Sequence, residues 1–216
     1  YLTESMWYNS NLLRPEEVRS YDDFLNPKWR GKIGFLDPRT PGAGDSNWSY
    51  MWMVKEEDYL KKLAAQSLFI SRDQRLLAEN LAKGKIALVI GLTHYTFLPF
   101  IRAGLPVKPL PPVKEGTYGT GGSGNLSIIK NPPHPNATKV FVNWLLGKEG
   151  QEVFTKAMGQ ATRRLDVDTQ WLKDFGVLPG KDNLTLKQFL EAENQSEEKL
   201  EEVREPALKV AKKLLD

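Results

Sequence analysis

Residues 86–92 are the feature of this sequence that most constrains the fold. The run contains only apolar residues and one glycine, and it is far too short for a membrane-spanning helix, which needs about 20 residues. Such a run is typical of a strand buried on both faces of a parallel sheet. Residues 32–36 have the same character, and helical patterns follow both segments. This alternation predicts an α/β protein with a mainly parallel sheet.

Apolar residues at helical spacing mark the other expected elements. A helix that begins at Asp45 or Ser46 places Trp48, Met51 and Trp52 on one face. Further helices are predicted at residues 56–66, 73–83, 97–103, 137–146, 151–158 and 184–216, and further strands at residues 6–8, 107 and 126–129.

The composition excludes several classes of protein. The chain has no cysteine, which rules out disulfides, Cys-ligated zinc, iron–sulfur clusters and thiol catalysis, and which fits an oxidising compartment. Its only histidines are His94 and His134, which are too few to favour a His-based metal site or catalytic triad. The net charge of +3 comes from scattered residues, and we therefore expect no nucleic-acid partner.

The turn before the first long helix is a candidate anion site. Gly42, Ala43 and Gly44 are small residues at an expected helix N-terminus, where backbone N–H groups and the helix dipole favour a negative charge. The spacing matches neither a P-loop nor a dinucleotide-binding turn. An ordinary strand–helix turn is the alternative interpretation. The polar side chains beside these backbone groups are Thr40, Asp45, Ser46 and Asn47.

A second candidate site follows the buried strand at residues 86–92. Thr93, His94 and Tyr95 come directly after it, and ligands of open parallel sheets bind beyond the carboxyl ends of the strands. The alternative is a His-Tyr pair that only caps a surface loop. Gln74 and Arg75 lie at an earlier helix start, where a solvated helix terminus is the commoner case.

Several segments together carry a family resemblance. They are residues 6–9 (MWYN), 21–33, 37–40, 84–87, 133–137 and 146–151. In this order they resemble bacterial extracellular solute-binding proteins of the ferric-iron-binding type, and the match covers nearly the whole chain. The resemblance implies the substrate-binding component of an ABC importer, with the type 2 periplasmic-binding-protein-like fold, a two-lobed α/β clamshell.

The resemblance also implies a domain organisation. It makes residues 1–8 a hinge strand, residues 9–120 lobe two, residues 121–171 a returning part of lobe one, and residues 172–216 C-terminal helices that pack mainly on lobe two. The first part of lobe one is then absent from this sequence. The family implies a monomer that delivers its ligand to a permease. It also implies a periplasmic or extracellular location, with a lipid anchor if the source is Gram-positive.

The family's ferric members bind iron through two adjacent tyrosines, and His94-Tyr95 stands at that place here. The resemblance therefore implies either ferric iron, bound by Tyr95 and His94 with phosphate or carbonate on the 41–45 turn, or a small organic or phosphorylated anion. Other ligand contacts implied in this way are Tyr8, Asn9, Gln74, Arg75 and Arg163.

Two alternatives from other classes remain at this stage. One is an α/β enzyme that acts on a small phosphorylated or sugar substrate, and the other is a pure interaction module. The sequence has no Gly-x-Ser-x-Gly, His-Glu-x-x-His or EF-hand pattern. We therefore expect binding without catalysis.

Overall fold

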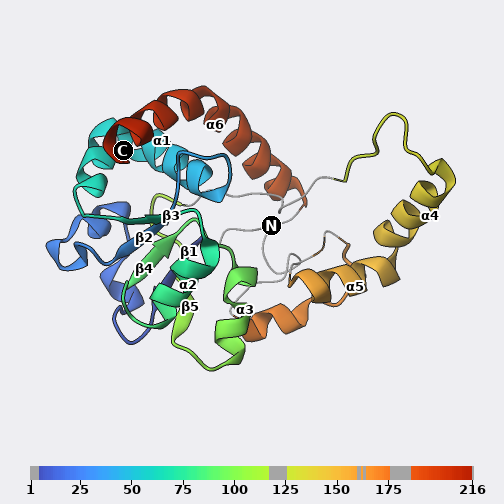
Figure 1. Ribbon diagram of the computed structural model, residues 1–216, viewed down its shortest axis with the longest axis horizontal. Coiled ribbons are helices and arrows are strands. Elements are labelled where there is room, and N and C mark those ends of the chain that lie inside the picture. The colour runs from blue at the N-terminus through green and yellow to red at the C-terminus, as the bar shows by residue number, and fades with distance from the viewer. Residues whose placement is uncertain (1–4, 117–125, 160–161, 163, 176–185, 216) are drawn as a thin grey trace.

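A mixed five-stranded sheet organises the computed structural model, which describes residues 5–116, 126–159, 162, 164–175 and 186–215, with backbone alone at 174–175 and 186–199 (Figure 1). The strand order is β3-β2-β4-β1-β5. The strands are β1 (Met6–Asn9), β2 (Ile33–Leu36), β3 (Phe69–Ser71), β4 (Leu88–Ile90) and β5 (Val107–Pro109).

The strand directions show that the sheet is mixed, and not mainly parallel as expected. Strand β2 pairs in parallel with both β3 and β4, as predicted for the buried apolar runs. Strand β1, however, lies antiparallel between β4 and β5. An apolar pattern reports burial and not chain direction, so the sequence could not reveal this reversal.

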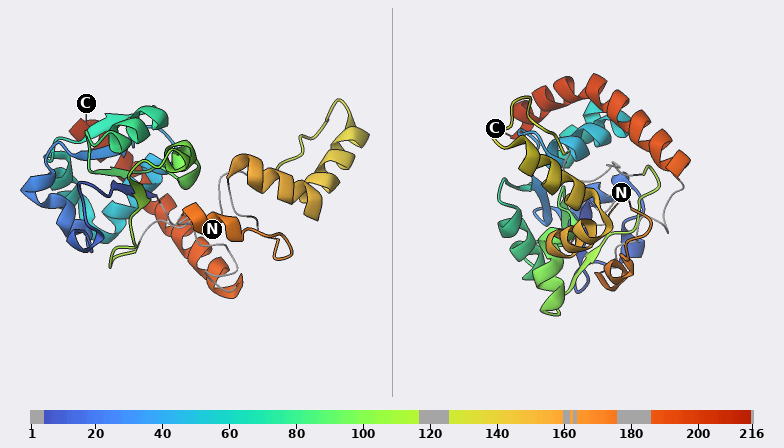
Figure 2. Two further views of the ribbon diagram at one scale, coloured as in Figure 1. Left: turned by 90° about the horizontal axis from the view of Figure 1, so that it is seen from below. Right: turned by 90° about the vertical axis from the view of Figure 1, so that its right-hand side faces the viewer.

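Helices cover both faces of the sheet (Figures 1 and 2). Side chains alternate along β1, so that Met6 and Tyr8 join the core on one face while Trp7 joins the core on the other. Trp7 stacks on Phe97 with ring centroids 4.4 Å apart. The first face is covered by α1 (Ala43–Ala64) and α6 (Leu186–Leu215), and the second by α2 (Gln74–Ala82) and α3 (His94–Arg102).

Several element boundaries differ from the sequence-based expectations. The two helices predicted between residues 45 and 66 are present as the two segments of α1, which meet at a kink at Glu56, where φ is 65° and ψ is 177°. Its N-cap is Gly42 and not Asp45 or Ser46. Residues 126–129 form no strand, and their apolar side chains are exposed. Short 3₁₀ helices occupy Pro15–Glu17, Tyr21–Leu25, Pro27–Trp29 and Gln170–Phe175.

Two helices extend away from the sheet as an arm. These are α4 (Pro135–Leu146) and α5 (Lys148–Met158), which contact each other, and α4 lies far from the sheet in both figures. The predicted apolar face of α4 is therefore not buried within the described chain. Phe141 is 54% exposed and Trp144 is 40% exposed.

Two glycines let α1 begin directly against the sheet. A Cβ on Gly44 would overlap the carbonyl oxygen of Leu36 at the end of β2. Gly91 follows β4 with a φ of 92°, and a Cβ there would lie 3.3 Å from the Cα of Gly44. Both positions thus require glycine for close backbone approach, and Gly91 also requires it for its left-handed conformation.

We predict that Gly44→Val destabilises the protein by about 3 kcal/mol, because the added atoms must displace backbone rather than a flexible side chain. Gly104→Ala is the matched control, since Gly104 has a φ of 69° but no atom lies within 4 Å of the position that a Cβ would take; we expect it to cost about 1 kcal/mol. Urea unfolding of both variants tests this, and equal losses of stability would contradict the packing argument.

Candidate functional site

Three helices begin at one edge of the sheet. The parallel strands β2, β3 and β4 end there at Leu36, Ser71 and Ile90, and they lead into α1, α2 and α3 respectively. We call this the carboxyl edge. Each helix N-terminus carries a partial positive charge, although at α2 the Asp73 carboxylate already accepts a hydrogen bond from the Leu76 N–H at 3.0 Å. The edge therefore combines the position where ligands of α/β sheets bind with a field that favours anions.

The predicted anion turn lies at this edge, but two of its side chains are turned inward. Asp45 is buried and pairs with Arg204 of α6 at 3.2 Å. Burial raises the pKa of Asp45, and Arg204 opposes part of that rise. Asn47 donates to the carbonyl of Ala43 at 2.7 Å and accepts from the Ser5 hydroxyl at 2.7 Å. Both side chains thus hold α1 in place.

The open part of this turn is its backbone. Gly42 has a φ of 143°, which a residue with a side chain rarely adopts, and no atom lies within 4 Å of the position of a Cβ. Thr40 bonds the carbonyl of Asp37 at 3.3 Å. The backbone is therefore open at Gly42, and an anion site at this turn stays a prediction.

The structure separates His94 from Tyr95. The His94 ring is 0% exposed, and its Nε2 atom faces the carbonyl oxygen of Gly159 at the end of α5. Its Nδ1 atom has no hydrogen-bond partner in the described part of the chain. Burial lowers the pKa of His94. A ligand could reach this imidazole only if the contact with Gly159 opened.

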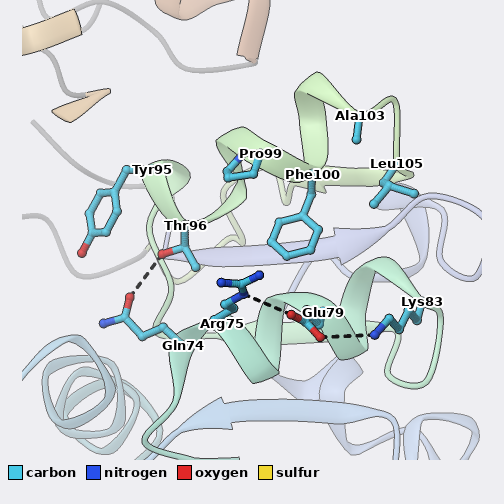
Figure 3. Close-up of a pocket in the computed structure, with 10 residues that line it drawn as sticks. All are labelled: Gln74, Arg75, Glu79, Lys83, Tyr95, Thr96, Pro99, Phe100, Ala103 and Leu105. Atoms are coloured by element: carbon cyan, nitrogen blue, oxygen red, sulfur yellow. Dashed lines mark hydrogen bonds and ion pairs between the residues drawn. The ribbon is translucent and has the colours of Figure 1, made fainter. Parts of the chain in front are cut away.

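Tyr95 instead lines a groove of about 690 Å³ between α2 and α3, together with Gln74 and Arg75 (Figure 3). The Thr96 hydroxyl donates to Gln74 Oε1 at 3.2 Å and joins the starts of the two helices. The fold thus brings three of the predicted site residues together. The full lining is Gln74, Arg75, Glu79 and Lys83 from α2, with Tyr95, Thr96, Pro99, Phe100, Ala103 and Leu105 from α3 and the turn after it.

Tyr8 and Asn9 are not brought to the carboxyl edge. Because β1 is antiparallel to β4, Asn9 lies at the opposite edge, where its side-chain amide donates to the Leu81 carbonyl at the end of α2 at 2.7 Å. Tyr8 is part of the buried core. The predicted contact Arg163 lies outside the described residues.

Sequence reasoning missed a charged cluster at the same edge. Asp37 follows β2 directly and is buried, with Arg39 Nε 2.8 Å from its Oδ1 and Arg72 Nε 2.9 Å from its Oδ2. Burial raises the pKa of Asp37, but the hydrogen bonds from Arg39 and Arg72 outweigh it and bring the pKa to about 2. Arg39 also bonds the Leu215 carbonyl at the end of α6. The only sequence signal was an acid placed directly after a buried strand.

The described ranges contain neither a metal-binding cluster nor a membrane-spanning helix. Within those residues, no three His, Asp or Glu side chains come together as a metal site. Of the helices formed by the same residues, none combines the length and apolar composition needed to cross a bilayer.

Comparison with known proteins identifies the family. Residues 1–152 match the sequence profile described as bacterial extracellular solute-binding protein. The chain belongs to this family. A protein of Haemophilus influenzae with no assigned function is 28% identical over 145 residues, which cover 65% of this chain and 41% of that protein.

Solved structures share the type 2 periplasmic-binding-protein fold of this solute-binding protein. Ferric binding protein from Campylobacter jejuni matches with a TM-score of 0.65 and 17% identity, over 97% of this chain and 66% of the other. Iron-bound HitA from Pseudomonas aeruginosa matches with a TM-score of 0.63 and 18% identity, over 97% of this chain and 65% of HitA. AfuA from Actinobacillus pleuropneumoniae, with fructose-6-phosphate bound, matches with a TM-score of 0.55 and 21% identity, over 91% of this chain and 63% of AfuA. The chain thus spans about two thirds of these structures.

We predict that the Asp37 cluster makes stability depend on acid pH. The folded-state pKa of Asp37, about 2, lies below the ordinary 3.8. The ionised carboxylate therefore stabilises the folded state above about pH 4, and this stabilisation is lost as the pH falls toward 2. The shift corresponds to about 2 kcal/mol at about 1.4 kcal/mol per pKa unit. Unfolding free energies from pH 6 to pH 2 should fall less steeply in Asp37→Asn than in the native protein, and parallel curves would contradict this.

Proposed function

We propose that the whole protein is the substrate-binding component of an ABC importer and that it holds a small anionic ligand at the carboxyl edge. The observation that carries this proposal is the meeting of the N-termini of α1, α2 and α3 at that edge. Three helix dipoles directed at one region favour negative charge there. Membership of the solute-binding family supports a role in uptake.

The ligand contacts that we propose are divided between backbone and side chains. Backbone N–H groups at Gly42 and Ala43 donate to one part of the anion, because the turn is open at that point. Gln74, Arg75 and Tyr95 provide polar side-chain groups from the neighbouring helices. Arg75 supplies positive charge with planar, paired donors that suit carboxylate and phosphate.

We infer that an organic or phosphorylated anion is the ligand rather than ferric iron. Ferric iron with phosphate or carbonate is the second candidate, supported by the iron-bound state of HitA, whereas AfuA holds fructose-6-phosphate. The orientation of His94 favours the organic anion, because its ring is buried against Gly159 and leaves Tyr95 as the one accessible member of the predicted pair. Within the described residues, Tyr95 alone thus offers iron fewer ligands than the predicted pair would.

We also infer that the protein binds its ligand without catalysis. It works in the periplasm or outside the cell, as a monomer, and it binds its permease when it carries the ligand. A lipid anchor would hold it at the surface of a Gram-positive cell. Its family consists of substrate-binding proteins, which supports the absence of enzymatic activity. Incubation with candidate phosphate esters should give no turnover, and release of inorganic phosphate would favour the enzyme alternative.

We predict that Tyr95→Phe distinguishes the two ligands. With an organic anion, the change removes one hydrogen bond and weakens binding by about 0.5–1.5 kcal/mol. With iron, it abolishes the visible phenolate charge-transfer band and most of the affinity. Native mass spectrometry of the purified whole protein identifies the ligand class, and absorbance and titration of the variant then give the size of the effect.

Gly42→Val tests the backbone contribution independently. The valine is strained at a φ of 143° and places its side chain in the open space before α1, so we expect affinity to fall by about 1–3 kcal/mol through lost donors. Gly31→Val serves as the control for backbone strain away from the edge, since Gly31 has a φ of 68° and no atom within 4 Å of the position of a Cβ. Unchanged affinity in Gly42→Val would remove this turn from the site.

We further propose that the arm belongs to lobe one, as residues 121–171, and that other parts of that lobe cover it in the whole protein. The exposure of Phe141 and Trp144 supports this, since solvent-exposed apolar surface of this kind marks an interaction site. The share of the solved structures that this chain spans also supports it. In the same scheme residues 9–120 form lobe two, residues 172–216 are C-terminal helices that pack mainly on it, and residues 1–8 are the hinge strand.

We predict that amide hydrogens of α4 exchange at least about tenfold more slowly in the whole protein than in the 216-residue chain, because buried helices open less often. Hydrogen exchange with mass spectrometry measures this directly. Helix α2, which already packs on the sheet, is the internal control. Equal exchange of α4 in both proteins would contradict the lobe assignment.

A further inference from the structure

The groove between α2 and α3 has two chemically different walls (Figure 3). The α3 side is apolar and contributes Pro99, Phe100, Ala103 and Leu105. Leu105 is 42% exposed, and Phe100 is half-buried with its ring packed against the core, so this apolar wall is partly open to solvent. An open apolar wall beside charged groups is the usual composition of a small-molecule site.

The α2 side is charged and carries an excess of cations. Glu79 lies between Arg75 and Lys83, with Arg75 Nε 3.1 Å from its Oε1 and Lys83 Nζ 3.2 Å from its Oε2. One carboxylate thus faces two cations. Figure 3 shows the Arg75 guanidinium group in the space between the helices, below Pro99 and Phe100. An occupant that carries a negative charge suits this wall better than a neutral or cationic one.

One end of the groove lies at the carboxyl edge. Gln74, Tyr95 and Thr96 stand there at the starts of α2 and α3, and they belong to the groove lining, while Gln74 and Tyr95 are also proposed ligand contacts. A molecule bound at the edge can therefore continue into the groove without crossing another element. The volume of about 690 Å³ is within the range of small-molecule pockets.

We propose that this groove is an apolar subsite, and that the ligand is an organic anion with an apolar or aromatic part that packs on Phe100 and Leu105 while its charged group lies at the carboxyl edge near Arg75. This inference rests on the proposed function and narrows its ligand class. Ferric iron with an inorganic anion would leave the groove empty.

Paired titrations of the whole protein with inorganic phosphate and with phenyl phosphate test the subsite. The two probes share the anionic group and differ in the ring. We expect phenyl phosphate to bind at least about tenfold more tightly, which is the effect of removing most of one ring from water. Calorimetry measures both affinities under one set of conditions.

Leu105→Ser should reduce this ratio at least about threefold and leave the affinity for inorganic phosphate unchanged, since it shortens the apolar wall alone. The matched control is Leu12→Ser, because Leu12 is 45% exposed but does not line the groove. Both leucines are exposed, so neither variant removes a core side chain. Thermal unfolding of the two variants checks that each is folded.

The outcomes separate the two proposals. Equal affinities for the two probes, or a ratio that Leu105→Ser leaves unchanged, would overturn the subsite while leaving the anion site at the edge in place. Failure of both probes to bind would overturn the anion site itself. A ratio lost equally in Leu12→Ser and Leu105→Ser would mean that the preference arises outside the groove, and it would also overturn the subsite.

Discussion

The contact between the first turn of α1 and the ends of β2 and β4 is the constraint on which the proposed site depends. Gly44 and Gly91 permit it, because a side chain at either position would meet backbone. From this fixed start, α1 carries Trp48 into the core, and the Trp48 indole N–H bonds the Ala207 carbonyl of α6 at 3.0 Å. One close approach therefore positions both the open turn at Gly42 and the helical layer above the sheet.

The apolar runs predicted the centre of the fold because a strand that is buried on both faces consists almost entirely of apolar residues. Strands β2 and β4 lie where residues 32–36 and 86–92 indicated, and the helix starts after them were predicted at the correct edge. The direction of a strand does not change its composition, so the sequence did not indicate it. The family resemblance put Asn9 among the ligand contacts, but the antiparallel course of β1 places it at the opposite edge, as a hydrogen-bond donor to the end of α2.

Helical geometry explains why an adjacent pair at the carboxyl edge could not be assigned from sequence. Successive residues of an α-helix point about 100° apart, so the packing of His94 in the first turn of α3 does not turn Tyr95 inward with it. The structure turns His94 inward to Gly159 and leaves Tyr95 at the groove. A sequence shows that both residues follow a buried strand, but the packing of a distant segment decides which of them is accessible. The Asp37 cluster was missed for the same reason, since Arg72 reaches it from beyond another strand.

The antiparallel course of β1 also determines where the α/β unit is joined to the rest of the chain. Strand β1 is entered at Ser5, whose carbonyl accepts from the amide of Gly91 at 2.7 Å. Strand β5 is left at Leu110, whose amide donates to the Met6 carbonyl at 2.9 Å. Both connections therefore lie side by side at the carboxyl edge. The entry to β1 and the exit from β5 are thus bonded to the sheet beside β4, the strand that leads into α3.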